Sequence, residues 1–193
     1  MNDLWRVLGI VAFAAWPIVP ILWVQVHAWS SFWRRLGGLT YAVVISEWLI
    51  VAVLAVIFRN FLLGHRLDFG ILSWLGVFPL ILGLALNVWT GKKLSLKALV
   101  GYPELKLSEA QRLVSTGPFS VIRHPTYLAH ILMLAGIFLI TGYTGTGFLT
   151  LFDIFISYGV IIPLEERELE ARFGDDYREY KRRVPKFLPR LVG

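Results

Sequence analysis

Long apolar runs separated by short polar stretches dominate the pattern along this chain. A helix needs about 20 apolar residues to cross a hydrocarbon core about 30 Å thick. The pattern therefore predicts about five membrane-spanning helices. They are expected at about Leu4–Val26, Leu39–Phe58, Ile71–Trp89, Tyr127–Tyr143 and Gly147–Leu164. The first contains Pro17 and Pro20, so we expect it to be kinked, which neighbouring helices can tolerate.

The last two predicted spans form a helical hairpin. Both are short, and the Gly/Thr-rich sequence Thr144-Gly145-Thr146 lies between them, so the hairpin, residues 127–164, either crosses the membrane fully or re-enters. Two polar-rich stretches, Gly91–Arg123 and Glu165–Gly193, flank it in sequence. The hairpin should bring these stretches together in space, where a water-soluble cofactor would meet the protein.

Composition supports an integral membrane protein. The 193 residues are 56% hydrophobic and 17% charged, whereas soluble domains carry about 25% charged residues. This excludes a disordered chain, and the absence of Cys excludes a disulfide-stapled module, a thiol nucleophile and Cys-ligated metals. We expect one all-α integral membrane domain over residues 1–193. Residues 1–90 would supply three spans, and residues 91–193 the chemistry-bearing half with a cytosolic amphipathic helical tail.

The basic residues are distributed unevenly between the two sides of this predicted bundle. Ser30–Gly38, Gly91–Thr126 and the C-terminal tail hold 2, 6 and 8 of the 19 Lys and Arg residues. The other side has Arg6, Arg59 and Arg66. Because positive charge is retained in the cytosol, the N-terminus is expected outside and the tail inside.

Two polar motifs could carry chemistry at the cytosolic face. Arg123-His124-Pro125-Thr126-Tyr127 precedes the fourth span, and the free N–H groups of a helix start suit a carboxylate or phosphate. The alternative is a positively charged flank with an interfacial Tyr. Glu165-Glu166 follows Pro163, and adjacent carboxylates at a membrane boundary are costly unless solvated or paired. The alternative there is an ordinary solvated helix start.

The C-terminal tail has the pattern of an amphipathic helix. An apolar stripe recurs every three or four residues, at Leu169, Phe173, Tyr177, Tyr180 and Val184. Basic residues occupy much of the remaining surface: Arg172, Arg178, Lys181, Arg182 and Arg183. The pattern predicts docking on anionic lipid at the cytosolic leaflet, although Tyr177 and Tyr180 could instead line a pocket. No nucleic-acid partner is expected.

Polar residues inside the spans are a further set of candidates. Glu47, Asn87 and Asp153 lie within them, and a carboxylate at mid-bilayer costs roughly 2.5–3.5 kcal/mol, so these groups should face the protein interior. No metal site is expected. His124 and His130 are six residues apart, which places them on different faces of a helix.

The ordered motifs of the C-terminal half resemble a known enzyme family. They are Leu113-Val114-Ser115-Thr116-Gly117-Pro118-Phe119, Arg123-His124-Pro125-x-Tyr127, Glu165-Glu166, Phe173-Gly174-x-x-Tyr177-x-x-Tyr180 and Val184-Pro185. Over about residues 110–190 this set resembles the membrane methyltransferases typified by isoprenylcysteine carboxyl methyltransferase and phosphatidylethanolamine N-methyltransferase.

The resemblance implies S-adenosyl-L-methionine as the cofactor, enclosed by the C-terminal half at the cytosolic face. The pocket residues carried over are Leu113, Val114, Phe119, His124, Pro125, Thr126, Tyr127 and Glu165. Arg123, Glu166 and His130 are the catalytic candidates, with Glu166 or His130 as the base that an amine acceptor would need. The acceptor should be lipophilic and enter laterally from the bilayer.

One departure from the family pattern leaves the acceptor open. Carboxyl methyltransferases carry an Arg four residues before the first Glu, implicated in holding the substrate, and this chain has Ile161 there. An isoprenylcysteine-like carboxylate and a phospholipid-like amine therefore both remain candidates, and the oligomeric state is undetermined. The rival interpretations are a nicotinamide-dependent sterol-reductase-like enzyme and a non-enzymatic membrane scaffold.

Overall fold

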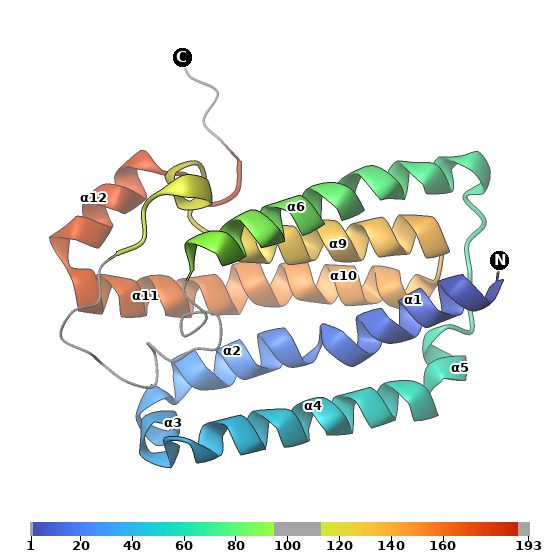
Figure 1. Cartoon of the computed structure of the whole chain (residues 1–193), viewed down its shortest axis with the longest axis horizontal. Coiled ribbons are helices and arrows are strands. Elements are labelled where there is room, and N and C mark those ends of the chain that lie inside the picture. The colour runs from blue at the N-terminus through green and yellow to red at the C-terminus, as the bar shows by residue number, and fades with distance from the viewer. Residues whose placement is uncertain (1, 95–112, 189–193) are drawn as a thin grey trace.

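A computed structural model describes residues 2–94 and 113–188, and within these ranges every regular element is a helix (Figure 1). The prediction of an all-α protein is confirmed. The elements are α1 (Asn2–Ala15), α2 (Ile18–Ala28), α3 (Ser30–Leu36), α4 (Leu39–Ile57), α5 (Arg59–Leu62), η1 (Gly70–Gly76), α6 (Val77–Lys93), η2 (Gly117–Ser120), α9 (Pro125–Thr141), α10 (Thr144–Ile156), η3 (Ser157–Ile161), α11 (Ile162–Phe173) and α12 (Asp175–Arg183).

The long helices lie side by side in one elongated bundle (Figure 1). Within the described residues, four helical stretches are long and apolar enough to cross a membrane: Asp3–Val26, Leu39–Ile57, Gly70–Lys93 and Thr144–Phe173. The remaining predicted span corresponds to α9, an apolar helix of 17 residues, at the short end of the length that spans a bilayer. The protein is an integral membrane protein, and the count of five crossings stays a prediction. The expected kink is present where α1 ends and α2 begins, at Trp16-Pro17.

The hairpin forms, but its turn lies earlier than the sequence predicted. Gly142 and Tyr143 connect α9 to α10, and Gly142 has a φ of +71° with its N–H donating to the Phe138 carbonyl at 2.7 Å. A Cβ on Gly142 would also lie 2.1 Å from the Leu67 carbonyl oxygen, so glycine is required on both counts. Thr144-Gly145-Thr146 instead forms the first turn of α10.

The second arm of the hairpin is longer than predicted. Helix α10 runs through the π-helical turn η3 into α11 without a break, so the helix continues past Leu164 to Phe173. Pro163 has no N–H to donate, and the wider π-turn directly before it accommodates this loss. As a result, Glu165 and Glu166 lie inside a helix and not at its start.

Glycine allows the end of η1 and helix α6 to pack at close range against α9. A Cβ on Gly76 would lie 2.6 Å from the Gly136 carbonyl oxygen, and one on Gly83 would lie 2.8 Å from the Ala129 carbonyl oxygen. Small residues at such contacts let helix backbones approach closely, which is the main way that helices associate in lipid. This contact fixes α9, the helix that begins at the candidate site.

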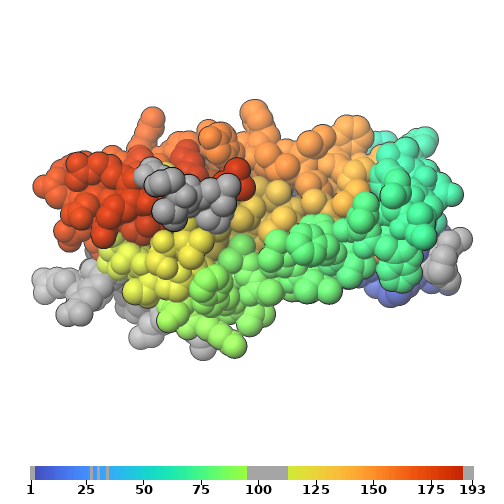
Figure 2. Space-filling model, turned by 90° about the horizontal axis from the view of Figure 1, so that it is seen from above, coloured from blue at the N-terminus to red at the C-terminus, as the bar shows by residue number. Residues whose placement is uncertain are grey.

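The polar segments gather at one end of the bundle. In Figure 1, α3, the last turn of α6, η2, the start of α9 and helices α11 and α12 all lie at the end opposite the N-terminus. Figure 2 shows the segment around η2 between α12 and α6. Arg6 donates to Asn60 at 3.2 Å at the other end. The described basic segments therefore share one end, as the charge pattern required; Lys97, Lys106, Arg112 and Arg190 lie outside the described residues.

Candidate functional site

The site is assembled where the start of α9 meets the end of the tail. The backbone N–H of Arg123 donates to the Pro185 carbonyl at 2.8 Å, and that of His124 donates to the Lys186 carbonyl at 3.3 Å. Pro125 occupies the first turn of α9, where its missing N–H costs nothing. These bonds hold two segments about 60 residues apart against each other.

The guanidinium of Arg123 forms its hydrogen bonds with other groups of the protein. Its Nη2 and Nε donate to Glu166 Oε1 at 2.8 and 3.2 Å, and its Nη1 donates to the Lys181 carbonyl at 3.0 Å and to the Val184 carbonyl. The residue is 9% exposed. A buried arginine with this many bonds joins α9, α11 and the end of α12.

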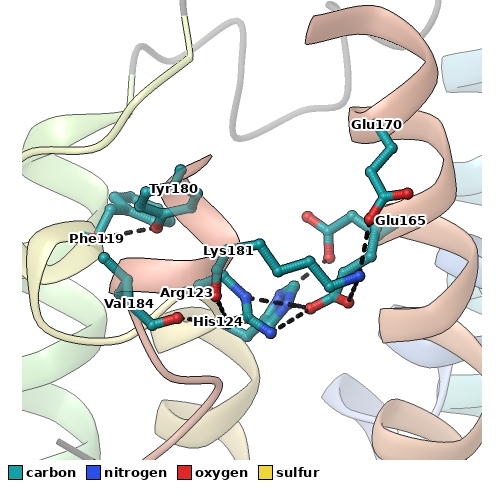
Figure 3. Close-up of polar contacts among 9 residues, drawn as sticks. Phe119, Arg123, His124, Glu165, Glu170, Tyr180, Lys181 and Val184 are labelled. Carbon is teal, nitrogen blue, oxygen red and sulfur yellow. Dashed lines mark hydrogen bonds and ion pairs between the residues drawn. The ribbon is translucent and has the colours of Figure 1, made fainter. Parts of the chain in front are cut away.

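The Glu166 carboxylate lies within ion-pair distance of three basic side chains. Besides Arg123, His124 Nε2 lies 3.1 Å from Glu166 Oε1, and Lys181 Nζ lies 3.0 Å from Glu166 Oε2. Lys181 also reaches Glu170 Oε1 at 2.8 Å, as Figure 3 shows. These contacts with Glu170 and Glu166 raise the pKa of Lys181. Such pairing favours the ionised carboxylate, so the geometry disfavours Glu166 as a base that accepts an acceptor's proton.

His124 bridges the two glutamates. Its Nδ1 lies 3.4 Å from Glu165 Oε2, while its Nε2 contacts Glu166. Only the imidazolium carries two N–H groups, so both contacts are satisfied together when His124 is protonated. Burial alone would lower the pKa of His124, but the bonds to Glu165 and Glu166 outweigh it and raise the pKa above 6.5.

Glu165 and Tyr177 are the two polar side chains beside Glu166 that bear on ligand binding. The Glu165 side chain is 28% exposed, against 8% for Glu166. The Tyr177 hydroxyl is buried and has no hydrogen-bond partner in the part of the chain that the structure describes. Burial together with the charges of Glu166 and Glu165 raises the pKa of this phenol. A carboxylate that remains accessible and a buried donor without an acceptor are features of a site built to receive a polar molecule.

The apolar stripe of the tail packs inside the protein. Tyr177, Tyr180 and Val184 form a buried cluster with Leu113, Leu169 and Phe173. The Tyr180 hydroxyl donates to the Phe119 carbonyl at 2.7 Å, and burial raises the pKa of Tyr180 to about 12. The stripe therefore holds the η2 segment in place, and the docking of α12 on anionic lipid stays a prediction that rests on its exposed arginines alone.

Most of the predicted pocket residues lie at the start of α9 or in the buried cluster around Tyr177. Tyr127 packs against Ile161 and Ile162, with its ring centroid 5.9 Å from that of His124. Pro125 is buried, Thr126 is half-buried, and Val114 is 37% exposed. His130 lies apart, with its ring 5.9 Å from that of Trp16 inside the bundle.

Sequence reasoning missed two members of the cluster, Lys181 and Glu170. Lys181 was expected on the lipid-facing surface of the tail, but it lies against α11. Glu166 and Glu170 are one helical turn apart on the same face, which is a signal that could have predicted a shared cation. Hereafter the ion-pair cluster means Arg123, His124, Glu165, Glu166, Glu170 and Lys181. Within residues 2–94 and 113–188, no group of three or more His, Cys, Asp or Glu residues could hold a metal ion.

This helix start and carboxylate pair lie in a region of the chain with known relatives. The sequence profile of the phospholipid methyltransferase family matches residues 71–176, more than half of the chain. The chain belongs to this family. No solved structure matches it.

Individual relatives are similar over shorter segments. The cobalt-zinc-cadmium resistance protein of Cupriavidus metallidurans is 34% identical over 41% of the chain and 36% of its own length. Methanethiol S-methyltransferase 1 of Bradyrhizobium diazoefficiens is 38% identical over 37% of the chain and 24% of its own length. Protein-S-isoprenylcysteine O-methyltransferase of Schizosaccharomyces pombe is 27% identical over 44% of the chain and 36% of its own length. Each match therefore covers less than half of the relative.

Proposed function

We propose that the chain is a membrane methyltransferase that transfers a methyl group from S-adenosyl-L-methionine to a lipophilic acceptor. The observation that carries this proposal is the partly exposed Glu165 held beside the uncapped start of α9, with the unpartnered Tyr177 hydroxyl in the same buried region. Membership of the phospholipid methyltransferase family supports the reaction type.

The residues present fit this cofactor. Glu165 offers a carboxylate to an ammonium group, and the first turn of α9 offers N–H groups to a carboxylate. Leu113, Phe119 and Tyr127 offer apolar and aromatic surface to a purine. When bound, the cofactor supplies a methyl group on a sulfonium, which is already reactive. Arg123, Glu166 and Lys181 would keep Glu165 and His124 in position.

The acceptor should come from the bilayer and need not be a carboxylate. Ile161 is fully buried against Tyr127 and Ile162, so an apolar contact occupies the position where a carboxyl methyltransferase carries an arginine. Without that cation, a carboxylate acceptor would lack its partner. We favour an amine or thiol acceptor, with the site on the cytosolic side because the basic segments gather there.

Calorimetric titration of S-adenosylmethionine and its demethylated product into detergent-purified protein tests the cofactor site. Wild type should bind both at micromolar concentration, and Glu165→Gln should weaken binding at least tenfold. Glu168→Gln is the matched control, since Glu168 lies on the same helix, has a similarly covered side chain and pairs with Arg172; it should bind normally.

The same titration separates the rival functions. No binding of S-adenosylmethionine to folded wild-type protein would overturn the proposal. Binding of a nicotinamide cofactor instead would favour the sterol-reductase-like alternative, and binding of neither would favour a scaffold.

A further inference from the structure

Three polar side chains lie inside the bundle, away from the ion-pair cluster. They are Trp16 at the break between α1 and α2, His130 of α9 and Asp153 of α10, and hereafter we call them the interior trio. Trp16 Nε1, His130 Nδ1 and Asp153 Oδ2 are all buried, and none has a hydrogen-bond partner within residues 2–94 and 113–188. A buried polar atom without a partner costs about 1–3 kcal/mol, so three in one region require an explanation.

The hairpin places His130 and Asp153 level with each other. Leu134 of α9 and Leu149 of α10 belong to one buried cluster with Ala12, and the Gly147 backbone lies against the Phe138 ring. Because the two helices are antiparallel, stepping back four residues from Leu134 and forward four from Leu149 moves about 6 Å in the same direction along both. These steps arrive at His130 and Asp153.

Both side chains point into the protein. Asp153 is 3% exposed and lies on the buried face of α10 with Thr146, Leu149 and Thr150. His130 faces the first helix, since its ring meets the Trp16 ring edge-on at 5.9 Å. The other charged residues of the helices α1 and α6, which also pack on α9, lie near helix ends: Asp3, Arg6, Lys92 and Lys93. Within the described residues of α1, α6 and α10, Asp153 is therefore the acid at the level of His130.

His130 lies further into the bundle than the ion-pair cluster. His130 is six residues from His124, about 9 Å further along α9. A cofactor held at the ion-pair cluster and an acceptor reaching His130 would therefore approach each other along the same helix.

We propose that His130 is the base that accepts the acceptor's proton and that Asp153 is its positioning residue. This inference rests on the proposed function and narrows the acceptor to a thiol or an amine. The bond from sulfonium sulfur to methyl carbon breaks, and its electron pair stays on that sulfur. A new bond forms from the acceptor sulfur or nitrogen to the methyl carbon, and the acceptor's proton passes to His130, where the Asp153 carboxylate stabilises the imidazolium.

The pairing of His130 with Asp153 can be tested without cofactor or acceptor. In protein labelled with ¹⁵N-histidine, the His130 signal is assigned as the one that His130→Gln removes. Asp153→Asn should shift this signal and leave that of His65 in place, while the control Glu47→Gln, a carboxyl on α4, should shift neither. A His130 signal identical in wild type and Asp153→Asn would overturn the pairing.

The base role is tested with three acceptors: octanethiol, phosphatidylethanolamine and N-acetyl-S-farnesylcysteine. Wild type should methylate the thiol or the amine. His130→Gln and His130→Asn should lower kcat about 100-fold or more and remove the acid limb of its pH profile, with calorimetric cofactor binding within twofold of wild type. Unchanged turnover in both variants, or methylation of the farnesylcysteine carboxylate alone, would overturn the role. Failure of wild type to bind the cofactor would instead overturn the proposed function and leave the histidine spectra as the test of the pair.

Discussion

The ion-pair cluster and the interior trio both contain buried polar side chains, but they differ in how the buried atoms are satisfied. In the cluster, each Glu166 oxygen has a cation within 3.1 Å, and Arg123 bonds two carbonyls as well. In the trio, one polar atom of each side chain has no partner. A buried network that is satisfied rigidifies a structure, whereas unsatisfied groups reduce stability and remain available to a ligand. Arg123, Glu166 and Lys181 therefore hold the candidate site in shape, whereas the proton transfer that we propose falls to the trio.

The largest expected loss of stability comes from a substitution that breaks the ion-pair cluster. Glu166→Gln leaves Arg123, His124 and Lys181 around a neutral amide, and removing one partner of a buried ion pair typically costs about 3–5 kcal/mol. Unfolding by denaturing detergent in mixed micelles measures this loss. Glu168→Gln, which removes the partly covered ion pair with Arg172, is the control and should cost far less. Equal losses in the two variants would show that the cluster is not what holds the tail to α9.

The next prediction concerns the interior trio, where a substitution should raise the free energy of unfolding and not lower it. Asp153→Asn replaces a buried carboxyl, whose Oδ2 has no hydrogen-bond partner among the described residues, with an amide that has no charge to desolvate. The free energy of unfolding should therefore rise by about 1 kcal/mol or stay unchanged. Turnover should fall in the same variant, as is common where a site is built at the expense of stability. A loss of stability as large as that of Glu166→Gln would contradict the comparison.

A smaller effect distinguishes the two tyrosines beside the cluster. Tyr180→Phe removes a bond to the Phe119 carbonyl and should cost about 0.5–1.5 kcal/mol. Tyr177→Phe removes a hydroxyl that has no partner, so stability should hold while cofactor affinity falls. Thermal unfolding and calorimetry on both variants check this, and a stability loss in Tyr177→Phe equal to that in Tyr180→Phe would refute it.

The pH dependence of stability reports on His124. Because its folded pKa is raised, the folded state binds the proton more tightly than the unfolded chain. The contribution is fully present below about pH 6.5 and is lost as the pH rises through the raised pKa. Stability measured from pH 6 to 9 should therefore fall in wild type and stay flatter in His124→Gln. Parallel curves for the two proteins would show that His124 is not charged in the folded state.

The smallest effect concerns lipid at the exposed face of α12. Arg178 and Arg183 pair with Asp175 and Glu179, which reduces their attraction for anionic lipid, and Arg182 is also exposed. A basic residue near an anionic surface contributes about 1 kcal/mol. Arg182→Gln should reduce retention of phosphatidylglycerol by severalfold at most, measured against Arg6→Gln at the other end of the bundle.

The sequence by itself determined the helical membrane fold, the kink at Trp16-Pro17 and the motifs at Arg123-His124 and Glu165-Glu166. Hydrophobic run length, proline geometry and local spacing are properties of neighbouring residues, so they can be seen without coordinates. The turn of the hairpin was misplaced by two residues because Gly142 is required by contact with Leu67, which lies far away in sequence.

Only the tertiary structure decided what each candidate touches. In the structure the apolar stripe of the tail packs inside the protein, and Lys181 forms ion pairs with Glu166 and Glu170. Of the two adjacent glutamates, Glu165 has the more exposed side chain. The tertiary structure also brought His130 and Asp153 to one level of the hairpin, although 23 positions separate them in the chain. Contacts of this kind depend on which helix faces pack together, and a pattern of neighbouring residues does not contain that information.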